Sequence, residues 1–199
     1  KLGINLIRLA VEPANMIKQS DTNNQSSTYP TEPEILDEII TKTTSNKMVL
    51  QLQVNNASFT NSLRFISYLA KRYKNNPYVW INPSNEINCN FNRDESPDPM
   101  RHNDTSTICA NSNIWLQQMS DYIRTIRQTG FNNPIVVNGL LWGGQFPDEI
   151  LKFTSTQSNI ILGAHIYAND QTEFKTPPEW TKLSQNYAII ADEVGFVNT

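Results

Sequence analysis

Short apolar runs alternate along this chain with segments of helical periodicity, and this alternation constrains the fold more than any other feature. The apolar runs predict buried strands, because each is short and is bounded by residues typical of turns. Six strands are predicted in this way, over residues 4–9, 48–53, 78–81, 135–137, 160–165 and 188–191. Apolar stripes at helical spacing predict the helices between them, at Pro33, around Phe65, around Trp115, at Pro147 and around Trp180.

This repeated strand–helix order predicts a parallel sheet with right-handed crossovers. Two arrangements satisfy it, an open doubly wound sheet and a (β/α)8 barrel of the TIM type. No GxGxxG or GxxxxGK[ST] motif follows any strand, which removes support from nucleotide-binding open sheets. The length of 199 residues fits one α/β domain, or most of one, over residues 1–199. Because the chain starts at a strand and ends just beyond one, we interpret it as the middle of a barrel and as a fragment of a longer polypeptide. We expect a partial TIM barrel with six βα units, in which the first and last strands are missing from this chain.

The overall composition excludes several classes of partner. The net charge is −3 and the 16 basic residues form no run, which argues against nucleic-acid binding. No apolar stretch approaches the roughly 20 residues needed to cross a bilayer. The two cysteines have only His102 nearby, at a spacing that matches no zinc-ligand pattern. We therefore expect no nucleic acid, no membrane span, no metal ion and no cofactor.

A long polar loop, from about residue 89 to residue 112, interrupts the strand–helix order. Cys89 and Cys109 flank most of it and could form a disulfide worth roughly 3 kcal/mol. Such a bridge implies an oxidising compartment, so we expect an extracellular protein; the alternative is two unrelated free thiols. Glycosylation sequons occur about as often as chance allows in a chain so rich in Asn, Ser and Thr, at Asn24, Asn56 and Asn103.

Polar residues gather where the predicted strands end. The carboxyl ends of parallel barrel strands meet at one mouth, so these residues should lie together. They are Arg8, Gln53 with Asn55, Asn85 with Glu86, Trp142, His165 with Tyr167, and Glu193. Two carboxylates, a cation, amides and aromatic faces are what glycoside hydrolysis needs: one carboxyl to protonate the leaving oxygen, and one carboxylate to attack or stabilise the anomeric carbon. Arg8 beside one carboxylate would keep that group ionised.

At these positions the chain resembles clan A of the retaining glycoside hydrolases, most of all the TIM-barrel endoglucanase and mannanase families such as cellulase family 5. The resemblance covers nearly the whole chain. Its carriers are the GINLIRL strand with Arg8, the Asn85-Glu86 pair, the His165-Ile166-Tyr167 motif, and IIADEVG with Glu193.

The resemblance implies that Glu86 is the general acid/base and Glu193 the nucleophile. The substrate-binding residues are then expected around these two carboxyls. Asn85 would contact the sugar 2-hydroxyl, and the remainder of the set is Arg8, Gln53, Trp142, His165 and Tyr167. Asp192 should face away from Glu193, because successive side chains of an extended segment alternate.

Two departures from the family pattern point to a second function. The family often has a His where this chain has Gln53, and a Pro usually follows the acid/base where this chain has Ile87. Glu86 and Glu193 could also be N-cap acids of the following helices.

The leading hypothesis is a retaining enzyme that cleaves β-glycosidic bonds of a β-glucan or β-mannan by double displacement. The alternatives are an inactive barrel serving as an extracellular carbohydrate-binding or structural module and, less favoured, an open-sheet enzyme of another class. We expect the protein to bind a polysaccharide or oligosaccharide. We also expect further segments of the same polypeptide to complete the barrel.

Overall fold

The core of the structure is a single curved sheet of six parallel strands in the order β1-β2-β3-β4-β5-β6. The computed structural model describes residues 5–12, 33–55, 59–85, 112–144, 146–147, 150, 158–168 and 178–196. The strands are β1 Leu6–Val11, β2 Val49–Val54, β3 Val79–Asn82, β4 Ile135–Asn138, β5 Ile160–Ala168 and β6 Ala188–Phe196. Because every described neighbour is parallel and follows in chain order, the sheet is six strands of a (β/α) barrel, as predicted.

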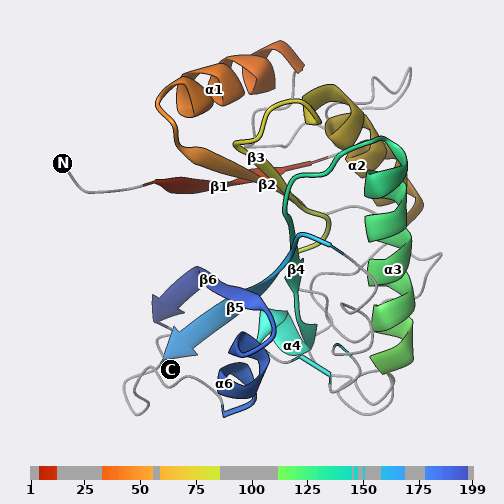
Figure 1. The fold of residues 1–199 in the computed structure, drawn as a ribbon, viewed down its shortest axis with the longest axis vertical. Helices are drawn as coiled ribbons and strands as arrows, with labels where there is room; N and C mark the ends of the chain where they lie inside the picture. The colour runs from red at the N-terminus through yellow and green to blue at the C-terminus, as the bar shows by residue number, and fades with distance from the viewer. Residues whose placement is uncertain are drawn as a thin grey trace, which may run out of the picture.

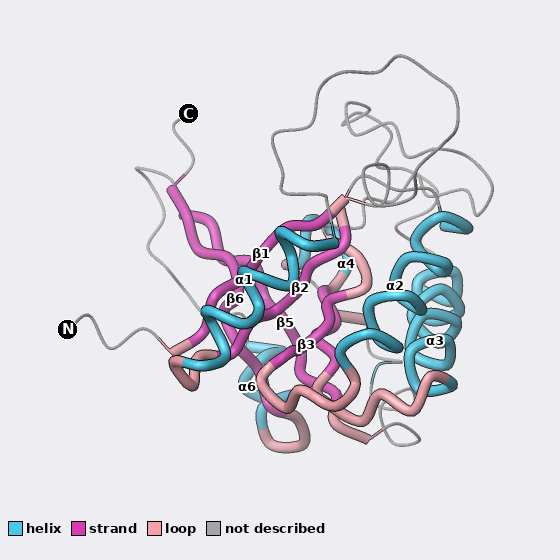
Figure 2. Tube along the Cα trace, turned by 90° about the horizontal axis from the view of Figure 1, so that it is seen from above, coloured by secondary structure: helices cyan, strands magenta, loops and turns pink. Residues whose placement is uncertain are grey.

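Helices connect the strands and cover the outer face of the sheet (Figures 1 and 2). They are α1 Pro33–Ser45, α2 Phe59–Tyr73, α3 Ser112–Gln128, α4 Leu140–Gly143 and α6 Pro178–Ser184. Pro33 suits the first turn of α1, and Lys42 in the last turn complements the helix dipole. Gly130, with φ +83°, lies just beyond α3, where a left-handed residue ends a helix. Among the described residues no helix is long and apolar enough to cross a membrane.

Every strand ends later than predicted, and the last two strands run furthest beyond the predicted ends. The sequence places the ends of the last two strands at residues 165 and 191, but β5 continues to Ala168 and β6 to Phe196. Ile166 pairs with Val194 and Tyr167 with Gly195, so the ladder persists beyond the apolar runs. The side chains of Tyr167 and Glu193, one from each extension, are joined by a hydrogen bond.

Agreement for the helices is close. Four of the five predicted helices are present as α1, α2, α3 and α6, and the short α4 was not predicted. Of the helix expected at Pro147, Ile150 is helical, while Leu151 and Phe153 lie outside the described residues.

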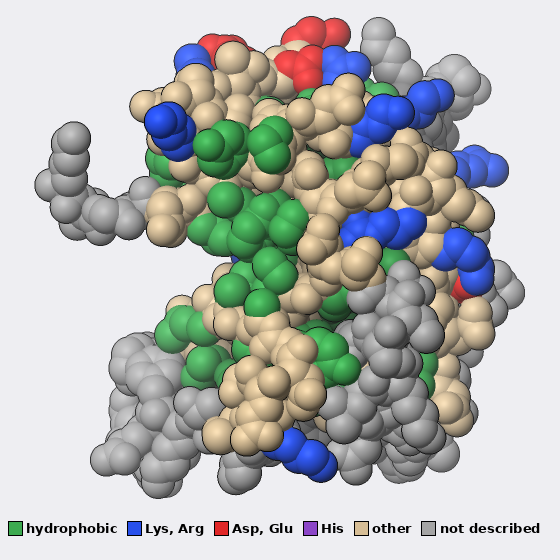
Figure 3. All heavy atoms as spheres, in the orientation of Figure 1, with side chains coloured by type: hydrophobic (Ala, Val, Ile, Leu, Met, Phe, Trp, Pro, Cys, Tyr) green, Lys and Arg blue, Asp and Glu red, His purple; other side chains and the backbone are tan. Residues whose placement is uncertain are grey.

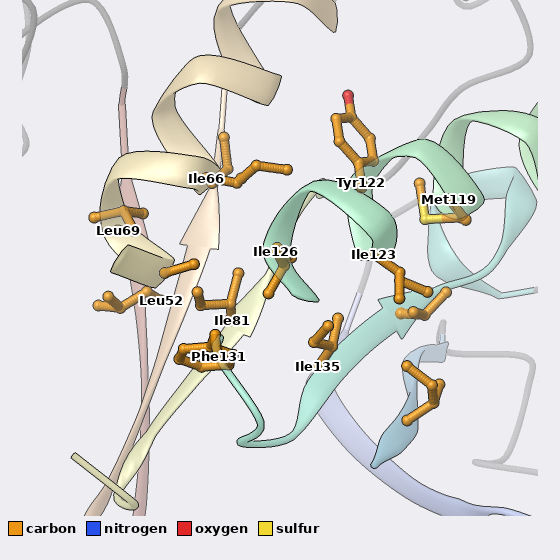
Figure 4. Close-up of a cluster of buried hydrophobic side chains, with 14 of the residues drawn as sticks. Leu52, Ile66, Leu69, Ile81, Met119, Tyr122, Ile123, Ile126, Phe131 and Ile135 are labelled. Carbon is orange, nitrogen blue, oxygen red and sulfur yellow. The ribbon is translucent and has the colours of Figure 1, made fainter. Parts of the chain in front are cut away.

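An apolar layer fills the space between the outer face of the sheet and helices α2 and α3 (Figure 4). Strand residues enter it at alternate positions, as Leu52 and Ile81 do, and both are fully buried. The helices contribute one stripe each, with Ile66 and Leu69 from α2 and Ile123 from α3. Burying each large side chain stabilises the fold by about 1.5–3 kcal/mol, which makes this layer the main source of stability.

The curved sheet is open between its two edge strands, β1 and β6. Both face the same side of the molecule in Figure 1, and Figure 3 shows the surface hollowed between them, with hydrophobic side chains on both walls. Ile7 of β1 is 37% exposed and Val194 of β6 is 56% exposed. The side chains on the inner face of the sheet form the site described next.

Candidate active site

Arg8 is the centre of a polar cluster on the inner face of the sheet. Its Nη1 donates to Oε2 of Glu193 at 2.5 Å, and its Nη2 donates to Oδ1 of Asn85 at 2.7 Å. The same Nη2 lies 3.2 Å from Nε2 of His165. One guanidinium therefore joins β1, the segment after β3, β5 and β6. The planar fork of arginine suits this role, because it directs several donors at once.

Both carboxylate oxygens of Glu193 have a partner. The Tyr167 hydroxyl donates to Oε1, Arg8 donates to Oε2, and His165 Nδ1 lies 3.7 Å from Oε2. Partial burial raises the pKa of Glu193, but the hydrogen bonds from Tyr167 and Arg8, with the electrostatic effects of His165 and Arg8, outweigh it and hold the pKa below its ordinary value. With 31% of its side chain exposed, Glu193 is an ionised carboxylate that a ligand can reach.

A β-bulge in β6 turns a second carboxylate toward the same cluster. Ala164 pairs with Ala191, and the next pair is His165 with Glu193, so Asp192 is an extra residue in the ladder. A bulge re-aims side chains that would otherwise alternate. The expectation that Asp192 faces away from Glu193 is therefore wrong: both side chains contact Arg8.

Asp192 is the most enclosed group of the cluster, with no exposed side-chain surface. Gln51 Nε2 donates to its Oδ2 at 3.0 Å, and Asn138 Nδ2 lies 3.2 Å from both oxygens. Arg8 Nε is 3.5 Å from Oδ2, and His165 Nε2 is 3.6 Å from Oδ1. A buried carboxylate requires such partners, because it has lost the water that would otherwise solvate it.

A chain of buried amides supports Asp192 from β3 and β4. Asn82 Nδ2 donates to Asn138 Oδ1, and Asn138 Nδ2 also donates to the Gly163 carbonyl at 2.9 Å. A Cβ atom at Gly163 would lie 2.7 Å from Asn138 Nδ2 and 2.8 Å from Asp192 Oδ2. Glycine is thus required at residue 163 to leave room for the contact between Asn138 and Asp192.

His165 is held from its other side by Gly143 of α4. Gly143 adopts φ +77°, a backbone conformation that favours glycine, and a Cβ atom there would lie 2.8 Å from the imidazole Cγ. His165 is 4% exposed. The short helix α4, which follows β4 directly, therefore packs against the imidazole ring of His165.

The structure brings together five of the predicted site residues, namely Arg8, Asn85, His165, Tyr167 and Glu193. Gln53 is buried in β2, and none of the hydrogen bonds found among the described residues joins its side chain to this cluster. Other predictions lie outside the described residues: Glu86, the side chain of Trp142, the pair Cys89 and Cys109, and the sequons at Asn24, Asn56 and Asn103. Those assignments remain predictions.

Sequence reasoning missed three polar residues of the cluster, Gln51, Asn138 and Asp192. A signal for Gln51 was present, because Gln51 and Gln53 alternate with leucines in VLQLQV and so share the inner face of β2. Asn138 ends a strand that is otherwise apolar. No local signal marks Asp192, since its direction depends on the register between β5 and β6.

The cluster pairs cations with carboxylates and is not arranged as a metal site. Within the part of the chain that the structure describes, no group of three or more His, Cys, Asp or Glu side chains could hold a metal ion. The arrangement instead presents one ionised, partly exposed carboxylate, that of Glu193, whose negative charge is paired with the Arg8 guanidinium. Such a group can act as a nucleophile or stabilise a developing positive charge.

Comparison with known proteins gives a consistent result. The family model described as cellulase, glycosyl hydrolase family 5, matches residues 1–199. A comparison with curated protein sequences gives no match.

Solved structures with the same fold include two endoglucanases. The catalytic domain of the major endoglucanase from Xanthomonas campestris pv. campestris has a TM-score of 0.64 at 17% identity, over 96% of this chain and 66% of that chain. Cel5A (EG2) from Hypocrea jecorina (Trichoderma reesei) has a TM-score of 0.65 at 16% identity, over 99% and 72%.

XacCel5A in complex with cellopentaose has a TM-score of 0.57 at 18% identity, over 85% of this chain and 54% of that chain. The chain thus spans between about half and three quarters of the length of these neighbours. The family model matches the chain from its first residue to its last, and the curved sheet agrees with the fold of these neighbours. The chain belongs to glycosyl hydrolase family 5, the cellulase family.

Proposed function

We propose that the protein containing this chain is an endo-β-glycanase that hydrolyses β-glycosidic bonds of a β-glucan or β-mannan with retention of configuration. The family and the neighbours described as endoglucanases support glycoside hydrolysis. The neighbour solved with cellopentaose supports a β-glucan among the candidate substrates. The observation that carries the proposal is Glu193: an ionised carboxylate at the mouth of the half-barrel, with one oxygen bound by Arg8 and the other by Tyr167.

Glu193 is the proposed nucleophile. In the first step a Glu193 oxygen would form a bond to the anomeric carbon as the bond to the leaving oxygen breaks. In the second step water would attack the same carbon, and Glu193 would leave with its electron pair as a carboxylate. Arg8 and Tyr167 stabilise the carboxylate, so they would orient it before the first step and receive it after the second.

Glu86 is the proposed acid and base. It follows Asn85 directly in the chain, and Asn85 is bound to Arg8 at 2.7 Å. The backbone N–H of Asn85 also donates to the Val54 carbonyl at 3.2 Å, which fixes this segment to the end of β2. Glu86 would protonate the leaving oxygen and then take a proton from the attacking water.

Hydrolysis of a panel of β-glucans and β-mannans by the intact protein tests the proposal. Glu193→Gln keeps the shape of the side chain and removes its charge, so we expect it to lower kcat by about a thousandfold or more, as for other catalytic nucleophiles. Glu38→Gln is the matched control, because Glu38 is exposed on α1 and pairs with Lys42 of the same helix. Equal activity of Glu193→Gln and the unmodified protein would overturn the proposal.

The same panel separates the alternative function. A barrel that has lost the reaction would bind saccharides without releasing reducing ends. Saccharide binding by both the unmodified protein and Glu193→Gln, with no turnover by either, would replace the enzymatic proposal with a binding module.

A further inference from the structure

We propose that Asp192 is a positioning residue that keeps Arg8 charge-compensated, and both Arg8 and His165 in place, while Glu193 is covalently occupied. The inference rests on the proposed function, because it assigns a role to Asp192 within the double displacement. The Asp192 side chain has no exposed surface, and in the proposed mechanism it does not contact the sugar.

Arg8 lies between two carboxylates. Its Nη1 is 2.5 Å from Glu193 Oε2, and its Nε is 3.5 Å from Asp192 Oδ2. The two contacts use different nitrogens of one planar group, so Asp192 can hold the guanidinium without competing for the nitrogen that binds Glu193. Arg8 and Gln51 are also register partners on adjacent strands, and both contact Oδ2 of Asp192.

His165 repeats this arrangement with its two ring nitrogens. Nε2 is 3.6 Å from Asp192 Oδ1, and Nδ1 is 3.7 Å from Glu193 Oε2. Asp192, with no exposed side-chain surface, therefore lies on the enclosed side of both groups, and Glu193, 31% exposed, lies on the side that solvent reaches.

The surroundings of Asp192 select a carboxylate at this position. Gln51 and Asn138 both direct NH2 groups at its oxygens. Asparagine has the same shape, but its own NH2 group would face one of these donors, and only one acceptor oxygen would remain. The bulge in β6 and the absence of a side chain at Gly163 make the space that the carboxylate fills.

The value of a second carboxylate follows from the charges during the reaction. When Glu193 bonds to the anomeric carbon it becomes a neutral ester, and Arg8 loses its nearest anion. Leaving a partly buried cation unpaired is costly, so the glycosyl–enzyme intermediate would be destabilised if Glu193 were the only counter-charge. Asp192 keeps its contact with Arg8 when Glu193 is esterified, so Arg8 stays in position to receive Glu193 when the ester is hydrolysed.

The test compares Asp192→Asn with the unmodified protein on an activated aryl β-glycoside, for which breakdown of the intermediate limits turnover. We expect the rate of intermediate formation to fall about 10- to 100-fold, less than for direct loss of a transition-state donor. The burst of aryl release should shrink, because the intermediate forms more slowly relative to its breakdown. An unchanged burst and formation rate in a folded Asp192→Asn protein would overturn the inference.

Asp121→Asn is the matched control. Asp121 is also a buried carboxylate, 4% exposed, but it lies on α3 and contacts Arg124 and Gln117. We expect its burst to equal that of the unmodified protein. Gln51→Leu is a second variant in case Asp192→Asn does not fold: it removes one donor to Asp192 and keeps the charge, so a smaller loss of burst is expected, and no loss would overturn the inference.

A measurement without turnover separates this inference from the proposed function. The groups that contact the Glu193 carboxylate among the described residues are Arg8 from β1 and His165 and Tyr167 from β5. Asp192, from the same strand as Glu193, contacts Arg8 and His165. Removing the negative charge of Asp192 should lower the pKa of Glu193 further, as followed by carbon-13 NMR of its labelled carboxyl group and assigned with Glu193→Gln.

An unchanged Glu193 titration in Asp192→Asn would refute the coupling even in an active enzyme. If the unmodified protein hydrolyses no glycan, the proposed function fails, while the NMR titration still decides whether Asp192 acts on Glu193 through Arg8 and His165, which contact both carboxylates.

Discussion

The outer and inner faces of the sheet are built in opposite ways. The outer face packs leucine and isoleucine side chains against α2 and α3 (Figure 4). The inner face carries charged and amide side chains, from Arg8 on β1 to Asp192 and Glu193 on β6. In β2 the division is visible residue by residue, since Leu50 and Leu52 face the helices and Gln51 contacts Asp192.

The difference separates stability from chemistry. Apolar packing has no fixed direction, so the outer layer tolerates changes that preserve volume. The inner cluster depends on individual donors and acceptors, and a lost partner leaves a charge or an amide unpaired. We therefore expect changes on the outer face to lower stability alone, and changes on the inner face to alter the activity and pH dependence of the folded protein.

Arg8→Met should have the largest effect, because it leaves two neighbouring carboxylates without the cation they share. We expect a loss of about 3 kcal/mol in the free energy of unfolding. Activity should fall by about a hundredfold or more. The pKa of Glu193 should rise, because a hydrogen bond and a charge that lower it are removed.

Urea unfolding and the pH dependence of kcat/KM measure these effects. The acid limb should move to higher pH in Arg8→Met. An acid limb that stays in place would show that Arg8 does not control the ionisation of Glu193.

Ile123→Ala tests the outer layer. Ile123 is fully buried on α3, so its truncation should lower the free energy of unfolding by about 2–5 kcal/mol. The kcat/KM of the folded protein and its pH profile should not change. Ile35→Ala is the control: Ile35 is 43% exposed on α1, and its loss should change stability by about 0.5 kcal/mol or less. A shifted pH profile in Ile123→Ala would break the separation between the two faces.

Asn138→Ala tests the point where the two regions meet. The Asn138 side chain binds Asp192 and Asn82, while its carbonyl accepts from Trp115 Nε1 of α3 at 3.2 Å. Losing the side chain should cost about 1–3 kcal/mol, because buried partners are left unsatisfied. Activity should fall as well, since Asp192 loses a donor. Loss of stability without any change in kinetics would place Asn138 with the outer layer.

Asp37→Asn should have the smallest effect, because its pair with Arg72 joins α1 to α2 at the surface. The hydrogen bond from Arg72 is the main cause of the lowered pKa of Asp37; burial opposes it and Tyr73 adds to it. A carboxyl whose pKa is lowered by folding stabilises the protein above its unfolded pKa, and this stabilisation is lost as the pH falls through the folded pKa.

Urea unfolding of both proteins at two pH values measures this contribution. The difference should be about 1 kcal/mol or less at pH 7. It should shrink as the pH falls below the ordinary aspartate pKa of about 3.9 and vanish below the lowered pKa of Asp37 in the folded protein. A difference that persists in acid would mean that Asp37 acts through packing.

The apolar outer face of the sheet could be predicted from sequence, and so could the two site residues on the edge strands, Arg8 and Glu193. Both depend on local sequence pattern. Alternation and helical spacing locate the strands and most helices, and the positions of Arg8 and Glu193 relative to predicted strands bring them together. The direction of Asp192 could not be predicted, because it depends on an extra residue in the β5–β6 register. The contact between Gln51 and Asp192, which are 141 residues apart, likewise arises only when the sheet curves.

The central claim is that Glu193 is the nucleophile of a retaining glycosidase, and trapping the intermediate tests it most directly. A 2-deoxy-2-fluoro β-glycoside with an activated leaving group should form an ester that breaks down slowly, and peptide mapping by mass spectrometry locates it. We expect the sugar on Glu193, with no label in Glu193→Gln. Label on Asp192 or on another carboxylate, or hydrolysis with inverted configuration and no label, would contradict the account.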